Sequence, residues 1–380
     1  MAVHRPDSSA ALAEAVADCV EARRTMAIRG AGTTDIVIDA DAVIDLAVHR
    51  GIVDYDPDEL VVAARSGTPL AEIEALLASR RQMLAFDPVD PRAIGGGAPG
   101  GATIGGVVAS GNAGPRRVSA GAARDHLLGF TAVSGRGEAF KAGGRVVKNV
   151  TGFDLAKLFA GSWGTLGVLD TVTLRVLPAP RFEATLIVPC DCAEAGGIMA
   201  AALRHAVAVS CAAWSDGRVL LRIDGFRPSV DARFDQLAKM VDRPGIERAD
   251  GADSARLWTG VRTVEAIPAT AALWRVGLPT MRGAAFAEAM MGEGFRVLID
   301  WGGARVWLGG DDDGDGGAGV VHARAVASGG HARLVRAAPA VRARAAPPPP
   351  DAATAMLYRR LREAFDPHGL FNPGLDPWER

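Results

Sequence analysis

The hydrophobic positions near the start of the chain alternate between helical and extended spacing. Apolar residues recur at helical intervals in the alanine-rich stretch 10–23, which predicts a helix, and a short strand is expected at 26–28. Apolar residues alternate with polar ones over 36–46, which predicts one or two further strands, and the run 60–64 predicts a buried strand. This part of the chain therefore mixes strands and helices.

A second helix is expected over 67–77. Thr68 is a residue type that favours the N-cap, and Pro69 suits the first helical turn. The apolar residues that share one face of this helix are Leu70, Ile73, Leu76 and Leu77.

The pattern changes after Pro178. Strands are expected at 181–189 and 219–226, and helices at 193–208 and 230–241, which together indicate a second α+β domain. The tract 309–350 runs through Asp/Gly, Ala/Arg and four prolines, a composition that predicts a loop or linker without a packed core. A short helix is expected over 352–365. We therefore divide the chain into a first domain, 1–179, a cap domain, 180–308, a linker, 309–350, and a C-terminal segment, 351–380, that returns to the first domain.

Composition supports a globular protein and excludes several classes. The 380 residues are 49% hydrophobic, enough to fill the cores of two domains. A formal net charge of -2 gives no field that would gather nucleic acid. The four cysteines have neither metal-ligand nor disulfide spacing, and the start lacks the plan of a signal peptide, so a cytoplasmic protein is expected. The sequence contains no run of about 20 apolar residues of the kind that spans a bilayer, so any membrane association is expected to be peripheral.

Glycine-rich motifs are concentrated between Gly95 and Pro178. They include 101–106, 148–154 and 161–167, and a shorter loop, 29–34, lies upstream. Glycine adopts positive φ and lets a ligand approach the backbone, so these loops predict a site for a large, phosphate-bearing cofactor.

Common nucleotide motifs do not fit these loops. The upstream loop lacks the third glycine of a Rossmann fingerprint and runs into another strand, and no P-loop motif occurs. The acidic run 311–316 begins like a calcium loop, but His322 stands where a bidentate Glu is required, so a solvated linker is favoured. His126, His322 and His331 have no partner at metal-ligand spacing, and no serine hydrolase elbow is present. No metal site is predicted.

Four ordered motifs resemble the FAD-binding fold of the vanillyl-alcohol oxidase / p-cresol methylhydroxylase (PCMH) superfamily. They are 29–33, 102–106, 161–168 and the terminal 366–374. A closer similarity, to the FAD-binding subunits of bacterial glycolate oxidase (glycolate dehydrogenase), is carried by the segments 49–60, 67–70, 113–117, 273–279 and 298–304. The resemblance covers nearly everything except 309–350. It implies an α+β fold, with a two-subdomain PCMH-type FAD-binding domain and a smaller α+β cap domain.

The resemblance also implies which residues bind FAD. The first loop would hold the pyrophosphate, the second segment would run along the cofactor, and the terminal asparagine would lie near the flavin ring. These expected cofactor-binding residues are Arg29, Gly30, Ala31, Gly32, Thr33, Thr34, Thr103, Gly105, Gly106, Ser110, Asn112, Gly114, Gly161, Gly164, Val168 and Asn372. Many relatives tether FAD through a histidine in the first loop. Ala31 stands between the glycines here, so non-covalent FAD is expected.

The cap lacks the histidine motifs that hold a metal in the catalytic 2-hydroxy-acid dehydrogenases of this superfamily. Oxidising a 2-hydroxy acid requires a base and a cation that grips the carboxylate. Arg275, Arg282 and Arg305 are cations that can grip a carboxylate, although a solvated surface role is the simpler interpretation of each. The cations that can offset charge on a reduced flavin are Lys148, Arg116, Arg117 and Arg124, and the sequence does not choose among them. No catalytic residue is assigned.

The function implied by the resemblance is that of an FAD-dependent oxidoreductase subunit. It would relay or support electron transfer in a complex that oxidises glycolate and related 2-hydroxy acids to glyoxylate. The implied partners are a larger FAD-containing catalytic subunit and an iron–sulfur subunit that passes electrons to a membrane quinone, at the inner face of the cytoplasmic membrane. Two alternatives stay open: an assembly module with vestigial FAD, and a self-sufficient FAD-dependent dehydrogenase.

Overall fold

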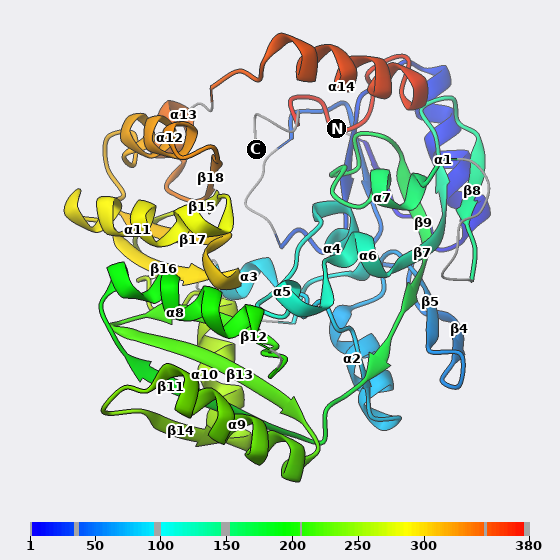
Figure 1. Ribbon diagram of the computed structural model, residues 1–380. Helices are drawn as coiled ribbons and strands as arrows, with labels where there is room; N and C mark the ends of the chain where they lie inside the picture. Colours follow the sequence, from blue (N-terminus) through cyan, green and yellow to red (C-terminus); the bar gives the residue numbers. More distant parts are fainter. Residues whose placement is uncertain are drawn as a thin grey trace.

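The computed structural model describes residues 2–33, 38–94, 100–145, 153–205, 207–345 and 348–375. Its elements form two lobes (Figure 1). We call the lobe that contains α1 to α7 and α14 the core lobe, and the lobe that contains α8 to α13 the cap. The α+β fold class is confirmed.

The core lobe is built on two main sheets, beside a small two-stranded sheet of β6 and β10. A parallel sheet has the order β1-β3-β2, and an antiparallel sheet has the order β4-β5-β9-β7-β8. The strands of this lobe are β1 (Ala2–His4), β2 (Met26–Arg29), β3 (Ala42–Asp45), β4 (Ile52–Asp56), β5 (Val61–Arg65), β6 (Gln82–Met83), β7 (Leu127–Val133), β8 (Ala139–Gly143), β9 (Val168–Arg175) and β10 (Leu177–Pro178). Its helices are α1 (Ser9–Glu21), α2 (Leu70–Ser79), α3 (Pro91–Ile94), α4 (Ile104–Ser110), α5 (Arg117–Ala120), α6 (Ala123–His126), α7 (Leu155–Phe159) and α14 (Ala352–Phe365).

Helix α2 forms where its apolar spacing predicts it. Leu70, Ile73 and Leu77 are buried on one face. The expected N-cap is wrong, because Pro69 occupies that position without a side-chain cap bond. Thr68 Oγ1 instead donates to the carbonyl of Arg65 at 2.7 Å and accepts from the amide of Gly51 at 2.9 Å, so it joins two loops rather than the helix.

The cap is one eight-stranded sheet in the order β14-β11-β13-β12-β16-β17-β15-β18. Its strands are β11 (Phe182–Pro189), β12 (Cys211–Ser215), β13 (Arg218–Gly225), β14 (Glu247–Asp250), β15 (Ala272–Gly277), β16 (Arg296–Asp300), β17 (Arg305–Gly310) and β18 (His331–Arg336). Its helices are α8 (Cys192–Arg204), α9 (Arg227–Val241), α10 (Gly251–Thr263), α11 (Gly283–Gly292), α12 (Ala318–Ala327) and α13 (Pro339–Arg344), with short 3₁₀ turns at η1 (Thr280–Arg282) and η2 (Trp301–Gly303). Both faces are buried: Trp274 packs into one core and its neighbour Leu273 into the other.

The prediction of a linker over 309–350 is wrong for most of the described residues in that range. This tract contains α12, β18 and α13, and Val321, Leu334 and Val341 are buried in the main cap core. The low-complexity composition concealed a helix whose few apolar residues recur at helical spacing, and a strand that pairs with β15. A single apolar face is enough to dock an element onto an existing sheet.

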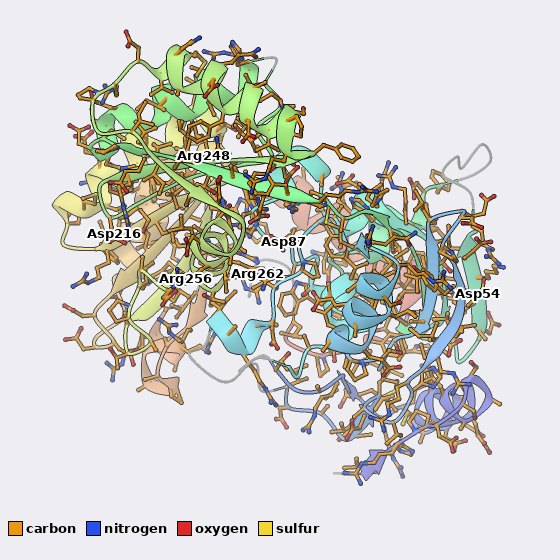
Figure 2. All side chains as sticks on the ribbon, turned by 90° about the horizontal axis from the view of Figure 1, so that it is seen from below. Asp54, Asp87, Asp216, Arg248, Arg256 and Arg262 are labelled. Atoms are coloured by element: carbon orange, nitrogen blue, oxygen red, sulfur yellow. The ribbon has the colours of Figure 1, made fainter. Side chains whose placement is uncertain are left out.

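The lobes are joined by polar contacts across their boundary. Arg116 Nη1 lies 2.5 Å from Asp224 Oδ2, and Arg262 Nη1 lies 3.3 Å from Asp87 Oδ1. Figure 2 labels Asp87 and Arg262 where the two lobes meet. After the cap, α14 runs back over the core lobe (Figure 1), and Phe371 is fully buried beside β2.

Candidate functional site

The first glycine loop follows β2 directly. The strand ends at Arg29, and Gly32 has φ +62°, a left-handed conformation that favours glycine. A Cβ at Gly30 would overlap Thr103 Oγ1 of the second glycine segment. The two loops therefore touch at a point where only glycine fits. Thr34, the last expected residue of this loop, lies outside the described residues, as does Lys148.

The second segment is fixed by α4. Thr103 is its N-cap, and Oγ1 accepts a hydrogen bond from the amide of Gly106 at 3.3 Å. A Cβ at Gly105 would lie 2.5 Å from Cβ of Ser66, so this glycine allows α4 to approach the loop after β5. Ser110, at the other end of α4, donates from Oγ to the carbonyl of Val107.

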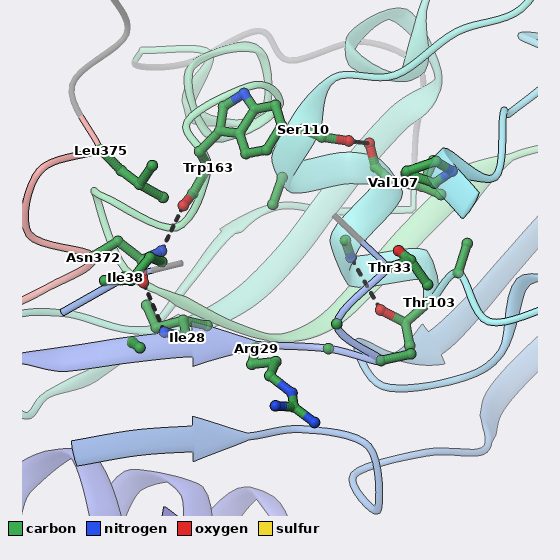
Figure 3. Close-up of a pocket in the computed structure, with 18 of the residues that line it drawn as sticks. Ile28, Arg29, Thr33, Ile38, Thr103, Val107, Ser110, Trp163, Asn372 and Leu375 are labelled. Carbon is green, nitrogen blue, oxygen red and sulfur yellow. Dashed lines mark hydrogen bonds between the residues drawn. The ribbon is translucent and has the colours of Figure 1, made fainter. Parts of the chain in front are cut away.

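The C-terminal asparagine links β2 to the glycine motif 161–168, which we call the third motif. Asn372 Oδ1 accepts from the amide of Ile28 at 2.7 Å, and Nδ2 donates to the carbonyl of Trp163 at 2.7 Å (Figure 3). Its side chain is buried, with 2% of the residue exposed. Gly164 has φ +73°, and a Cβ there would lie 2.8 Å from Asn372 Nδ2. Asn372 thus holds the first loop and the third motif in register.

These segments surround a cavity of about 340 Å³, which we call the glycine-loop cavity (Figure 3). Nine of the expected cofactor residues line it: Arg29, Gly30, Ala31, Gly32, Thr33, Thr103, Gly106, Ser110 and Asn372. Sequence reasoning did not select the apolar residues Ile38, Val89, Pro91, Trp163 and Leu375, which also line it. Trp163 lies inside a recognised motif, but the other four carry no signal beyond their apolar character.

The remaining expected residues lie outside that lining. Asn112 lines a neighbouring cavity of about 70 Å³, the connecting cavity, which shares Thr33, Pro91, Ser110 and Trp163 with the first. Gly105, Gly114, Gly161, Gly164 and Val168 line none of these cavities. Gly114 instead packs against Asp87, and Val168 is buried at the start of β9.

A third cavity, of about 460 Å³, opens between α5 of the core lobe and β15, β17 and β18 of the cap. It shares Ser110 with both other cavities and Arg275 with the connecting cavity, so the three cavities lie next to one another. Arg117, Arg275, Arg305 and His331 line it, and we call it the arginine pocket. Of the three arginines proposed from sequence, Arg275 and Arg305 lie here, whereas Arg282 is exposed on η1 and does not line the pocket.

Burial and mutual repulsion shape the electrostatics of this pocket. Burial lowers the pKa of Arg275, and nearby Arg117 lowers it further. Burial lowers the pKa of Arg305 well below its usual range, with a further contribution from Arg275. Burial and the charges of Arg275 and Arg305 likewise lower the pKa of His331, which favours a neutral imidazole at neutral pH.

Asp300 of β16 is the residue paired with Arg305 of β17 in the antiparallel sheet. Burial raises the pKa of this carboxyl to about 7, although the amide of Trp301 donates to Oδ1 at 2.7 Å and Arg305 lies nearby. Asp300, the acid paired with Arg305 across the two strands, is therefore only partly ionised near neutral pH.

No group of three His, Cys, Asp or Glu residues that can hold a metal ion occurs within the described ranges. Among the helices of those ranges, none is both long and apolar enough to cross a membrane.

Comparisons with known proteins find matches over different shares of the chain. Residues 1–143 match the family described as FAD binding domain. The chain is 35% identical over 374 residues to glycolate oxidase subunit GlcE of Escherichia coli (strain K12), a match that covers 97% of each chain. It is 33% identical over 156 residues to D-lactate dehydrogenase of Anaerostipes hadrus, covering 41% of this chain and 31% of that protein. It is also 27% identical over 190 residues to glycolate oxidase subunit GlcD of Bacillus subtilis (strain 168), covering 49% of this chain and 39% of that one.

Among solved structures, alkyldihydroxyacetonephosphate synthase superposes with a TM-score of 0.68 over 98% of this chain and 76% of that chain. The sequence identity is 14%, so this likeness concerns the fold alone.

Proposed function

Because the chain belongs to the family of the glycolate oxidase subunit GlcE, we propose that it is the FAD-binding subunit of a complex that oxidises glycolate and related 2-hydroxy acids. The family and the FAD binding domain make it an FAD-dependent oxidoreductase with FAD as its cofactor. Bound FAD supplies an acceptor for the two electrons that leave the α-carbon of the acid as hydride.

The observation that carries this proposal is the glycine-loop cavity. Its walls come from three glycine motifs and the C-terminal segment, and none of its described lining residues is acidic. Consecutive backbone amides in such a loop favour an anionic diphosphate, and a side chain at Gly30 would collide with the opposite wall. The residues therefore fit a phosphate-bearing cofactor with a large apolar part.

We assign the residues that hold FAD by segment. Those of the first loop, 29–34, hold the pyrophosphate, and the second segment, from Thr103 to Gly114, follows the cofactor. Asn372 positions the third motif, which contains Gly161, Gly164 and Val168, against the first loop. These roles rest on the family resemblance and on the hydrogen bonds of Asn372.

FAD is held without a covalent bond in this proposal. Ala31 occupies the position of the tethering histidine, and no described residue that lines the glycine-loop cavity is a histidine, cysteine or tyrosine. Acid precipitation of the purified chain should release all of the flavin into the supernatant. Flavin that stays in the pellet would contradict non-covalent attachment.

The proposed partners are a larger FAD-containing catalytic subunit and an iron–sulfur subunit. In this scheme the chain relays or supports the transfer of electrons towards a membrane quinone, at the inner face of the cytoplasmic membrane. The term subunit in the names of its relatives supports a complex.

Purification of the intact complex with quantified flavin and iron tests the assignment. We expect FAD in this chain and loss of flavin absorbance on adding glycolate. Gly30→Val should purify without FAD, whereas Gly144→Val should keep it, because a Cβ at Gly144 meets nothing within 4 Å. A Gly30→Val protein with full FAD would refute the loop assignment. FAD that does not respond to glycolate in the complex would favour an assembly role.

A further inference from the structure

The arginine pocket is separate from the residues assigned to FAD. It opens where the lobes meet, and its three guanidinium groups come from both sides: Arg117 from α5 of the core lobe, and Arg275 and Arg305 from adjacent cap strands. Of the segment assigned to FAD, only Ser110 and Gly111 reach it among the described residues. The pocket thus adjoins the cofactor site and has a different chemical character.

The described lining of this pocket contains no carboxylate to balance these charges. Within the described residues, neither Arg117 nor Arg275 has a salt-bridge partner, and the guanidinium of Arg305 donates only to the carbonyl of Ala113, at 3.3 Å. Charges brought together in this way are unfavourable unless an anion joins them. The arrangement therefore favours a negatively charged ligand.

Trp301 holds two of the arginines in place. The guanidinium carbon of Arg305 lies 3.3 Å from the centre of the indole ring, and that of Arg117 lies 4.5 Å from it. The indole Nε1 donates to the carbonyl of Gly114 at 2.9 Å, which anchors the ring to the core lobe. Stacking on an aromatic ring stabilises a guanidinium while its N–H groups remain able to donate. The pocket is therefore organised before any ligand arrives.

We infer that this chain has a binding site of its own for a small carboxylate, with Arg117, Arg275 and Arg305 as the groups that recognise it. A planar guanidinium matches a carboxylate because two N–H groups donate in parallel to its two oxygens. The inference goes beyond the proposed function, which gives this subunit no acid of its own. The guanidinium groups indicate that the ligand is a carboxylate. Its further identification as a 2-hydroxy or 2-oxo acid rests on the proposed function.

The site is tested by calorimetric titration of the full-length, FAD-loaded chain with glycolate and with oxalate, which cannot be oxidised by loss of hydride. Wild-type protein should bind both acids saturably. Arg275→Met should weaken binding by roughly tenfold or more, since a hydrogen bond between charged groups is worth about 1.5–3 kcal/mol. Arg275→Lys should retain part of the affinity. The control Arg282→Met should bind like wild type, because Arg282 is exposed and outside the pocket.

Three results would overturn the site: no binding of either acid to the wild-type chain, equal affinity in Arg275→Met, or equal competition by sulfate, which would show an unselective anion site. If Arg275→Met does not fold, Arg117→Gln on the core lobe is measured in its place, with the same expected loss. Flavin absorbance of each sample separates the two proposals. A chain that holds FAD but binds no acid lacks the carboxylate site, whereas a chain without FAD contradicts the proposed function.

Discussion

Replacing Asn372 with alanine should loosen the C-terminal segment and weaken FAD binding together. The change removes two partly buried hydrogen bonds of 2.7 Å, one with the amide of Ile28 and one with the carbonyl of Trp163. Each lost hydrogen bond costs about 0.5–1.5 kcal/mol. Asn372 also has φ +42°, where alanine adds about 1 kcal/mol of strain. The free energy of unfolding should therefore fall by about 2–4 kcal/mol.

Asn372→Asp keeps the acceptor for the amide of Ile28 but turns a second carboxylate oxygen towards the carbonyl of Trp163. It also adds a buried negative charge to the lining of the glycine-loop cavity, so FAD affinity should fall at least as far as in the alanine variant. Urea unfolding followed by tryptophan fluorescence gives the stability of the FAD-free chain, and titration of flavin fluorescence gives the dissociation constant for FAD.

Thr354→Ala is the matched control in the same C-terminal segment. It removes one exposed hydrogen bond, from Thr354 Oγ1 to Asp351 Oδ2, and should change stability by less than about 1 kcal/mol. The reasoning fails if Asn372→Ala matches this control in stability. It also fails if the variant loses stability but binds FAD with wild-type affinity, because both backbone partners of Asn372 line the cavity.

Three further predictions follow from buried groups. Burial alone would raise the pKa of Asp170, but hydrogen bonds from His49, Thr131 and Ser9 outweigh it and lower the pKa. The stabilisation by Asp170 is therefore present above its unfolded pKa, near 4, and is lost as pH falls through the folded value; Asp170→Asn should lose about 2–5 kcal/mol at neutral pH and flatten the acid limb of a stability–pH curve. Burial raises the pKa of Asp300 to about 7; Arg305 and Arg222 oppose this rise, and Asp87 reinforces it. Because Asp300 gains a proton and loses its negative charge as pH falls through 7, anion affinity in the arginine pocket should rise. Asp300→Asn should remove that dependence in calorimetry, and an unchanged pH profile would exclude Asp300 as its source. Leu334→Ala should cost about 2–4 kcal/mol in thermal unfolding, whereas Val326→Ala, at a position 62% exposed in the same tract, should have little effect; equal effects would contradict a packed tract.

The sequence predicted the elements whose apolar spacing is unambiguous. The helix expected at 352–365 has those bounds in the structure, and its N-cap is Asp351. The tract 309–350 was missed because composition dominated the interpretation. Its Asp/Gly run is a turn in which Asp315 accepts from the amides of Gly317 and Gly319, just before α12. Local hydrogen bonding, rather than low complexity, explains these residue types.

The candidate site was predicted only where glycine carries the signal. Gly30 and Gly105 are required because another chain segment occupies the space of a side chain, and such a constraint leaves a trace in the sequence. Val89 and Leu375 leave none, because an apolar residue that lines a cavity has the same composition as one that fills a core.

The arginine pocket shows why the choice among cationic residues needed the fold. Trp274 and Val276 of β15 face the main cap core, so the intervening Arg275 points to the opposite side of the sheet. That side meets the core lobe, where Val89 and Ile94 pack with cap residues. Arg282 follows the same strand but lies on a solvent-facing turn. Strand parity thus directs one arginine into the boundary between the lobes, and only chain topology brings Arg117, far away in sequence, to meet it. A carboxylate site of this kind exists only while the two lobes stay joined, so acid affinity and lobe contacts should be lost together.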